Sequence, residues 1–398
     1  MANAAPHRPG QHRRGPSIAL YATAGVFLAR LPVLPHREFD ADEFEHAHAA
    51  WCFFRGMIPY KDFFEHHTPW YYGLLRPFFR FFAVDSSFDS AMHFLVFGRC
   101  LSVALSILSV FLLIRIGRLW QATDRAAEQT HDVGPLAGLL FATQPIFLQK
   151  AIEIRPDMLA LPFFLGSVWL LLNGVRSGAI KFFVASGLSL GAAIMSTQKM
   201  LFVLPGAGVG LAAWSVLAEP AQGRRLAFRL DFSRILSTLL FVLAAMIPGA
   251  LTWLAFERHQ AGHEFITNNF LLNAHWNQVA TPQAGKLLLN SGPALLLGLL
   301  GAVVFLRRLW LSAPRAWTGF VPLCTAIGLL LGVLVIPVAQ RQYYLMPLPL
   351  VCLFAANGLI FATGRLPQHR RAIAIAALTI LLAVKPAITL WESFVEVN

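Results

Sequence analysis

The 398-residue sequence has few charged residues and few cysteines. Only 13% of its residues are charged, whereas soluble domains carry about 25%, so a soluble surface cannot be covered with polar groups. Three of the four cysteines, Cys100, Cys324 and Cys352, lie in apolar stretches, which does not suggest a disulfide framework. The sequence also lacks a Walker loop, a nucleophile elbow and an HExxH motif. These absences argue against a soluble domain and against an enzyme that uses a soluble nucleotide.

Long apolar stretches are abundant instead. They predict an all-α polytopic membrane protein with about eleven transmembrane helices. We read the first stretch as an uncleaved signal anchor, because it is long and no small-residue cleavage site follows it. The predicted spans are 17–34, 91–114, 133–149, 157–174, 180–196, 200–218, 235–256, 287–306, 316–339, 343–364 and 372–390.

Basic residues mark the ends of these spans. The formal net charge is +12, but the bases form no single arm or stripe, so a nucleic-acid partner is not predicted. With a cytoplasmic N-terminus, every inside segment is basic, as the positive-inside rule requires. We therefore divide the chain into a basic cytoplasmic N-terminus (1–16), a transmembrane domain (17–390) and an extracytoplasmic tail (391–398).

Acids and histidines gather on the predicted outer side, above all in the first extracytoplasmic loop (35–90). This loop is long for a connection without a function. We expect it to form two short interfacial helices separated at Gly56 and Pro59. A carboxylate such as Asp42 can serve as a general base or can help hold a metal with nearby histidines. The alternative is that these residues are solvated charges on an amphipathic interfacial helix.

Three further polar motifs fall on the same predicted side. In EIRPDM, Arg155 and Asp157 flank a proline that can start a helix, so Asp157 can also serve as a helix cap. In STQKM, Lys199 either extends to lipid headgroups or binds a phosphate. In RQYYLMPLPLV, Arg341 is the informative member, because tyrosines such as Tyr344 are common at membrane boundaries anyway.

With these motifs, the chain resembles the GT-C membrane glycosyltransferases. The similar branch includes dolichyl-phosphate-mannose protein mannosyltransferases and the bacterial aminoarabinose and galacturonic acid transferases. An acidic pair, Asp42 and Glu43, follows the first span, and the segment GMIPYKDFFEHHTP then runs from Gly56 to Pro69. The RPD turn at Arg155, the STQK turn at Lys199 and the YYLMPLPL segment follow in the order seen in that family.

The resemblance implies transfer of a hexosyl or pentosyl group from a polyprenyl-phosphate donor to an acceptor hydroxyl, with inversion. We assign Asp42 and Glu43 as catalytic residues, with Asp42 inheriting the role of general base from the family, and Lys199 as the first candidate for the donor phosphate. The expected partners are the lipid-linked donor and a lipid, glycan or protein acceptor. The expected location is a bacterial inner membrane, with the active site facing the periplasm. The substrate-binding candidates are Asp62, Glu65, His66, His67, Arg155, Asp157, Lys199, Arg341 and Tyr344.

The sequence departs from the family in two places. Some relatives carry Glu-Lys where this chain has Glu65, His66 and His67, so a histidine can replace that lysine at the phosphate. Longer relatives also end in a soluble extracytoplasmic domain, and we expect acceptor recognition here to fall to outer loops, notably 259–285.

No cofactor is required by these motifs, but a divalent metal stays open. The histidines that can supply ligands are His46, His66, His67, His259, His263 and His275.

Two other functions stay open at this point. A secondary transporter or lipid flippase would place ionisable residues near the middle of the membrane, often in two related halves. The predicted spans are nearly free of charge, with Arg99 as the main exception, and no internal repeat is evident. A catalytically inactive subunit is the third alternative.

Overall fold

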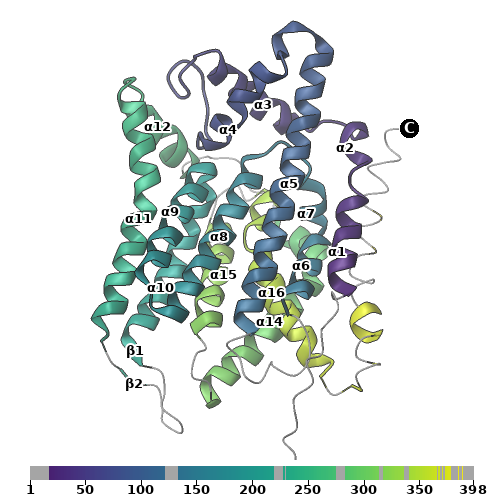
Figure 1. Cartoon of the computed structure of the whole chain (residues 1–398), viewed down its shortest axis with the longest axis vertical. Coiled ribbons are helices and arrows are strands. Elements are labelled where there is room, and N and C mark those ends of the chain that lie inside the picture. The colour runs from purple at the N-terminus through teal and green to yellow at the C-terminus, as the bar shows by residue number, and fades with distance from the viewer. Residues whose placement is uncertain are drawn as a thin grey trace, which may run out of the picture.

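The predicted apolar stretches form helices in the computed structural model (Figure 1). The structure describes residues 18–121, 133–218, 227–228, 230–274, 283–312, 317–335, 340–364 and parts of 366–388. The elements of the first half are α1 (Ile18–Leu28), α2 (Val33–His36), α3 (Ala41–Phe54), α4 (Trp70–Phe81), η1 (Val84–Ser86), α5 (Phe88–Gln121), α6 (Val133–Ala142), α7 (Pro145–Lys150), α8 (Pro156–Ser177) and α9 (Ile180–Ser196). Those of the second half are η3 (Gln198–Phe202), α10 (Val203–Val216), β1 (Leu217–Ala218), β2 (Ala227–Phe228), α11 (Phe232–Glu257), α12 (Gly262–Ile266), η4 (Thr267–Leu271), α13 (Leu272–Ala274), α14 (Gln283–Ser312), α15 (Trp317–Val335), η5 (Arg341–Leu345) and α16 (Leu348–Ala362).

The chain is an integral membrane protein, as the sequence predicts. Three apolar helices of the described chain, α6, α9 and α16, are shorter than a full span, so the count of about eleven crossings stays a prediction. The seven described segments that are long and apolar enough to cross a membrane are Ile18–His36, Phe88–Gln121, Pro156–Ser177, Gln198–Val216, Phe232–Glu257, Ser291–Leu309 and Trp317–Leu334.

Two predicted spans are interrupted at prolines. The span 133–149 divides into α6 and α7, because Pro145 disfavours a helical conformation at Gln144, whose ψ is 132°. The span 343–364 begins as the 3-10 turn η5, and its α-helix starts only after Pro347. Most of the predicted span 372–390 and all of the predicted segments 1–16 and 391–398 lie outside the described residues.

A small β pairing joins α10 to the segment before α11. Leu217 lies opposite Phe228 and Ala218 opposite Ala227 in an antiparallel pair of two-residue strands. This pairing is a local departure from the all-helical prediction.

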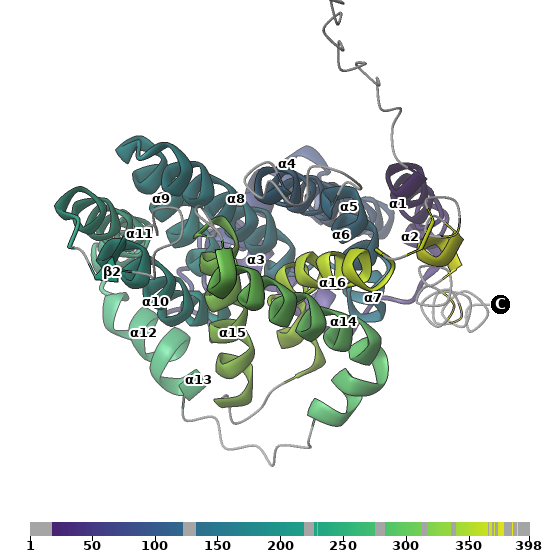
Figure 2. The same ribbon diagram turned by 90° about the horizontal axis from the view of Figure 1, so that it is seen from below.

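The helices form a sequence of packed neighbours (Figure 2). The closest pairs run from α11 to α9, α8, α5, α6, α16 and α14, while α10 packs on α15. Helix α5, with 34 residues, extends from the first-loop helices at one end of the bundle to the opposite end (Figure 1). It thus connects the end of the bundle that carries the first-loop motifs with the opposite end.

Glycines permit the tightest of these contacts. A Cβ atom at Gly301 in α14 would collide with the carbonyl oxygen of Phe354 in α16, and one at Gly358 would collide with that of Leu297. The same approach lets Asn357 Nδ2 donate to Gly301 O at 3.1 Å. Helices in membranes associate closely through such small residues.

The predicted helices of the first loop are present at one end of the bundle (Figure 1). Asp40 starts α3 with a capping box, in which its carboxylate accepts from the backbone while Glu43 accepts from Asp40 N–H at 3.0 Å. The helix ends at Phe54 before Gly56, whose φ of 88° is a conformation that glycine tolerates. The interfacial position of α3 and α4 stays a prediction.

These two helices have an apolar core of their own. Tyr71 and Tyr72 from α4 are fully buried, and Ala50 from α3 packs in the same cluster as Phe94 and Ile154. The first loop is therefore fixed against α5 and against the turn before α8, which is where the polar motifs lie.

Candidate functional site

Arg99 connects α5 to the start of the first loop. Its Nε and Nη2 donate to the two carboxylate oxygens of Glu43 at 3.0 and 2.8 Å, and neither side chain is exposed. The same guanidinium donates to the carbonyl oxygens of Leu34, Arg37 and Glu38 at 2.7 to 2.9 Å. Such a fully paired buried charge fixes the backbone that leads into α3.

Glu43 also reaches the turn before α8. Its Oε1 accepts from the backbone N–H of Ile154 at 3.2 Å, in addition to Arg99. Glu43 has no exposed surface, and all its contacts are internal to the protein.

Asp42 and Arg155 form the central contact of the site. Arg155 Nη1 donates to Asp42 Oδ2 at 2.6 Å; the arginine side chain is 3% exposed and the aspartate side chain 39%. Within the described chain, Asp42 Oδ1 has no hydrogen-bond partner. One carboxylate oxygen is thus held by a buried cation while the other stays available.

A row of alternating charges continues from this pair toward α7. Arg155 Nη1 also donates to Glu153 at 3.1 Å, and Glu153 accepts from Arg37 at 2.9 Å. Lys150 donates to Glu153 at 2.9 and 3.0 Å and to Asp40 at 3.1 Å. Glu153 therefore lies between three cations and Asp40 pairs with one, which compensates the cost of burying these charges.

On its other side, Arg155 faces Asp157 and Lys199. Arg155 Nε lies 3.6 Å from Asp157 Oδ2, and Lys199 Nζ donates to both oxygens of Asp157 at 3.1 and 3.3 Å. Lys199 also lies 4.3 Å from the centre of the Tyr343 ring, in a cation–π contact. The RPD turn, the STQK turn and the YYLMPLPL segment therefore meet here, as the sequence suggested.

Of the two adjacent tyrosines, Tyr343 faces the cluster. Tyr344, the predicted candidate, is 4% exposed and belongs to the apolar core. The side chain of Arg341 lies outside the described part of the structure.

The surrounding carboxylates keep buried Arg155 charged. Burial by itself lowers the pKa of Arg155, but Asp157, Glu153 and Asp42 outweigh that effect and raise the pKa above its ordinary value. Its buried Nε has no hydrogen-bond partner in the described chain. A buried cation with an unused donor is a suitable partner for a phosphate oxygen.

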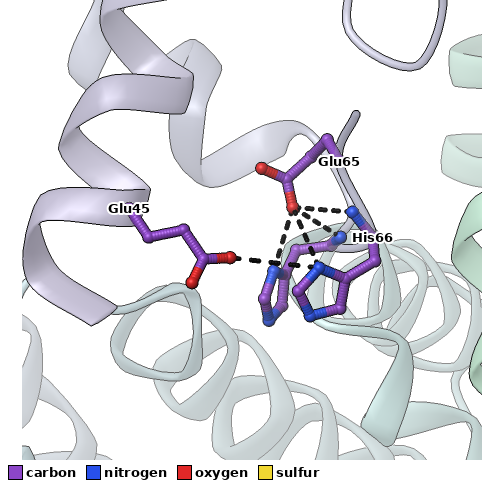
Figure 3. Close-up of side chains that lie close together, drawn as sticks. Glu45, Glu65 and His66 are labelled. Atoms are coloured by element: carbon purple, nitrogen blue, oxygen red, sulfur yellow. Dashed lines mark hydrogen bonds and ion pairs between the residues drawn. The ribbon is translucent and has the colours of Figure 1, made fainter. Parts of the chain in front are cut away.

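A second polar cluster lies on the same side, around Glu65 (Figure 3). Glu65 is 3% exposed, and its Oε1 accepts from the backbone N–H groups of His66 and His67 at 2.8 Å and contacts His67 Nδ1 at 3.0 Å. Glu45 from α3 points toward His66, with 3.9 Å between Oε1 and Nδ1 (Figure 3). His46 packs edge-on against His67 with ring centres 4.9 Å apart.

Burial sets the protonation of this cluster. Burial and the neighbouring His67 lower the pKa of His66 to about 4, and burial also lowers the pKa of His46 well below its ordinary value. Burial raises the pKa of Glu45, and the charge of Glu65 adds to that effect. Burial by itself raises the pKa of Glu65, but the hydrogen bond and the charge of His67 outweigh that effect and lower the pKa. The cluster thus combines an ionised Glu65 with a neutral His66 near neutral pH.

The donor set of this cluster fits a divalent cation. One ligand atom from each of Glu45, Glu65, His66 and His67 lies within 4.8 Å of all the others. Two carboxylates and two imidazoles are ligands that zinc accepts. Of the other predicted histidine ligands, His46, His259 and His263 are not in this group, and His275 lies outside the described residues.

Asp62 has a local role. Its Oδ2 accepts from the backbone N–H of Ile58 at 2.7 Å and so closes the turn within the GMIPYKDFFEHHTP segment. Among the described residues it forms no hydrogen bond or ion pair with Asp42 or Lys199.

The segment after α11 docks on the first loop. Asn273 Nδ2 and Gln198 Nε2 each donate to the backbone oxygen of His66 at 2.9 Å. Lys61 Nζ donates to the backbone oxygen of His259 at 2.8 Å. Residues 259–274, part of the predicted acceptor loop, therefore lie next to the Glu65 cluster.

Sequence reasoning missed Lys150 and Arg37. Lys150 ends a short helix that forms where Pro145 divides the predicted span, and it received no role because it lies directly after that span, 133–149. Its spacing of three from Glu153 on one short turn was the available signal.

Part of the chain matches a known protein family. Residues 87–253 match the family model described as dolichyl-phosphate-mannose-protein mannosyltransferase. No curated protein sequence matches the chain.

Several solved structures are similar to the whole chain. The apo oligosaccharyltransferase of Archaeoglobus fulgidus has a TM-score of 0.63 at 14% identity, over 95% of this chain and 56% of that protein. The same enzyme, AglB, in complex with an inhibitory peptide and a dolichol-phosphate has a TM-score of 0.56 at 14% identity, over 94% and 56%. ArnT from Cupriavidus metallidurans, bound to undecaprenyl phosphate, has a TM-score of 0.56 at 15% identity, over 94% and 71%. The chain spans just over half the length of the archaeal enzyme and about seven tenths of ArnT.

Proposed function

We propose that this chain, which has the GT-C superfamily fold and in residues 87–253 the match to its mannosyltransferase family model, is a polyprenyl-phosphate-sugar-dependent glycosyltransferase. The reaction transfers a hexosyl or pentosyl group to an acceptor hydroxyl at the extracytoplasmic face. ArnT bound to undecaprenyl phosphate and AglB in complex with a dolichol-phosphate support a lipid-linked phosphate donor.

The contact between Asp42 and Arg155 is the observation that carries this proposal. A partly exposed carboxylate with one free oxygen lies 2.6 Å from a buried guanidinium, whose Nε lies 3.6 Å from Asp157, the carboxylate that also binds Lys199. A base beside cations that can hold a phosphate is what this transfer requires.

The proposed step is a direct displacement at the anomeric carbon of the donor sugar. The proton of the acceptor hydroxyl passes to Asp42, and the acceptor oxygen bonds to the anomeric carbon of the sugar. The bond from that carbon to the phosphate oxygen breaks, and its electron pair stays on the departing prenyl phosphate. Attack from the face opposite the phosphate inverts the anomeric carbon. Lys199 and Arg155 stabilise the charge that gathers on the phosphate.

The other residues fall into separate roles. Glu43 is a positioning residue that acts through Arg99 and the backbone of α3. Asp157 holds Lys199 near Arg155. We keep His66, His67 and Glu65 as candidates for contact with the donor, and Arg341 as a further phosphate ligand. A divalent cation held by Glu45, Glu65, His66 and His67 would supply Lewis-acid stabilisation of developing negative charge.

The side and the membrane are part of the same proposal. The positive-inside pattern supports an extracytoplasmic position for α3, α4 and the charge row. The membrane that we propose is a bacterial inner membrane. The acceptor, a lipid, glycan or protein, approaches over the 259–274 segment that docks on the first loop.

Transport is the less favoured function. It was left open by Arg99, the charge within a predicted span. That guanidinium is fully engaged by Glu43 and three carbonyl oxygens, so it serves a static structural contact. Labelled lipid or solute that moves across vesicles containing only this protein would restore the transport hypothesis.

The experiment is a transfer assay with purified protein in liposomes. It offers a panel of radiolabelled polyprenyl-phosphate sugars with a membrane-glycan extract to the wild type, to Asp42→Asn and to Asp85→Asn. Asp85 is a matched control, because its carboxylate contacts Trp51 and Arg55 at an exposed position of the same loop. We expect transfer by the wild type and the control, and a loss of about 100-fold or more in Asp42→Asn. Full activity of Asp42→Asn would refute the assigned base.

A further inference from the structure

A second polar site lies at the opposite end of the bundle from Asp42. Helices α5 and α8 enclose a pocket of about 350 Å³ there. Arg99 and Arg115 are sixteen residues apart in one helix, so the pocket lies about 24 Å further along the axis of α5 than the Glu43–Arg99 ion pair. It therefore belongs to neither cluster of the proposed active site. The lining residues are Arg115, Arg118, Leu119, Trp169, Asn173 and Arg176.

Helical spacing brings these side chains together. Arg115 and Arg118 are three apart in α5, and Trp169, Asn173 and Arg176 follow one another at spacings of four and three in α8. Residues at such spacings share one face of a helix. Two facing stripes thus contribute three guanidinium groups to one pocket.

The pocket has an excess of positive charge. None of its lining residues is acidic. Within the described chain, neither Arg115 nor Arg176 forms an ion pair. The Arg115 guanidinium carbon lies 5.7 Å from the centre of the Trp169 ring, a cation–π contact that holds the group beside the pocket. Arginine donors arranged in this way match phosphate oxygens.

An apolar stripe leads from the middle of the bundle to this pocket. Ile107, Leu108 and Phe111 of α5 are 47%, 44% and 51% exposed, and Ile107, Phe111 and Arg115 follow at spacings of four on one helix face. On an integral membrane protein, such a surface contacts acyl chains. The apolar stripe and the basic pocket are together complementary to an amphiphile with an anionic head.

We propose that the pocket between α5 and α8 binds the phosphate headgroup of an anionic membrane phospholipid, with its acyl chains along Ile107 and Phe111. On the predicted topology, this end of the bundle lies in the cytoplasmic leaflet, where basic pockets between helices meet anionic lipids. The proposal does not depend on glycosyl transfer, because it concerns the opposite face of the membrane.

The test measures lipid binding by native mass spectrometry of the full chain released from detergent. The probes are phosphatidylglycerol, phosphatidylcholine and inorganic phosphate. The pocket variant is Arg115→Gln/Arg176→Gln. The matched control is Lys181→Gln/Arg307→Gln, which removes two charges from the same predicted side but outside the pocket. Thermal unfolding in lipid-free detergent verifies that both variants fold.

We expect the wild type to prefer phosphatidylglycerol over phosphatidylcholine. The pocket variant should lose about tenfold or more in affinity for phosphatidylglycerol, and the control about twofold or less. An equal loss in both variants would mean general charge attraction and would overturn the site. If inorganic phosphate displaces phosphatidylglycerol completely, the occupant is a soluble anion and the lipid assignment is wrong.

Discussion

Glu43 and Arg99 form an ion pair of 2.8 Å in which neither side chain is exposed. The pair joins the first turn of α3 to α5, and Asp42 is the residue next to it in sequence. The position of the proposed base therefore depends on a contact that no substrate reaches.

Replacing Glu43 should destabilise the protein more than it alters the chemistry. Glu43→Gln leaves Arg99 buried without a counter-charge, a change that costs about 3 to 5 kcal/mol in buried pairs. We expect a clearly lower thermal unfolding midpoint in detergent. Glu45→Gln is the control, because Glu45 lies nearby in α3 with a half-exposed side chain.

The double variant Glu43→Gln/Arg99→Met tests whether loss of the Glu43–Arg99 ion pair causes this destabilisation. Without the buried cation, the decrease in the unfolding midpoint should be smaller than the sum of the decreases in the two single variants. Strict additivity of the unfolding midpoints would contradict a direct Glu43–Arg99 coupling.

Removing the charge of Lys199 should weaken use of the donor. A hydrogen bond to a charged group contributes about 1.5 to 3 kcal/mol, so Lys199→Gln should lower kcat/KM for the polyprenyl-phosphate sugar about 10- to 100-fold. Lys181→Gln, at the opposite end of the bundle, should leave kcat/KM unchanged. Steady-state kinetics over a range of donor concentrations measures both. A kcat/KM for Lys199→Gln within twofold of the wild type would remove Lys199 from the donor site.

The neutral state of His66 should make stability depend on pH. Its pKa is about 4 in the folded protein and 6.5 in the unfolded chain, so the unfolded state binds the proton more readily. The contribution of His66 is complete above about pH 6.5 and is lost as the pH falls toward about 4. The unfolding midpoint of the wild type should therefore decline relative to His66→Gln across this window. Parallel pH profiles for the two proteins would contradict the lowered pKa.

The Glu65 cluster should bind a divalent cation. Calorimetric titration of chelator-treated protein with Zn²⁺ should give about one equivalent. We expect His66→Gln and Glu65→Gln to weaken this binding at least about 10- to 100-fold, the range already seen for residues that only orient ligands. His263→Gln is the control, because His263 contacts Thr267 outside the group. Equal zinc binding by all four proteins would place the ion elsewhere.

The sequence was sufficient to group the motifs. Asp42, Arg155, Asp157 and Lys199 were placed on one side by counting spans and charges, and the structure brings these four into one cluster. This succeeded because span length and the sign of loop charges are set by the bilayer and are local properties of the sequence.

Details that depend on packing were not accessible in this way. Glu43 looked like a partner of Asp42 in catalysis, because adjacent acids cannot be assigned to buried and exposed faces before the orientation of α3 is known. Tyr343 and Tyr344 lie in a 3-10 turn, where only the tertiary contact with Lys199 decides which ring faces the site. The helix break at Gln144 was also missed, because the local effect of Pro145 on the backbone outweighs the apolar run that predicts a continuous span.

The carbonyl oxygen of His66 accepts from Gln198 and from Asn273, which follow it by 132 and 207 residues. A ribosome needs about 10 to 40 s to add 207 residues at 5 to 20 residues per second. During that time the first loop, which the predicted topology carries across the membrane, can close the Glu43–Arg99 pair, whose members are 56 residues apart. The order of synthesis therefore separates early anchoring of the first loop from late completion of the candidate active site. A nascent chain arrested before η3 carries the proposed base, Asp42, but lacks Lys199.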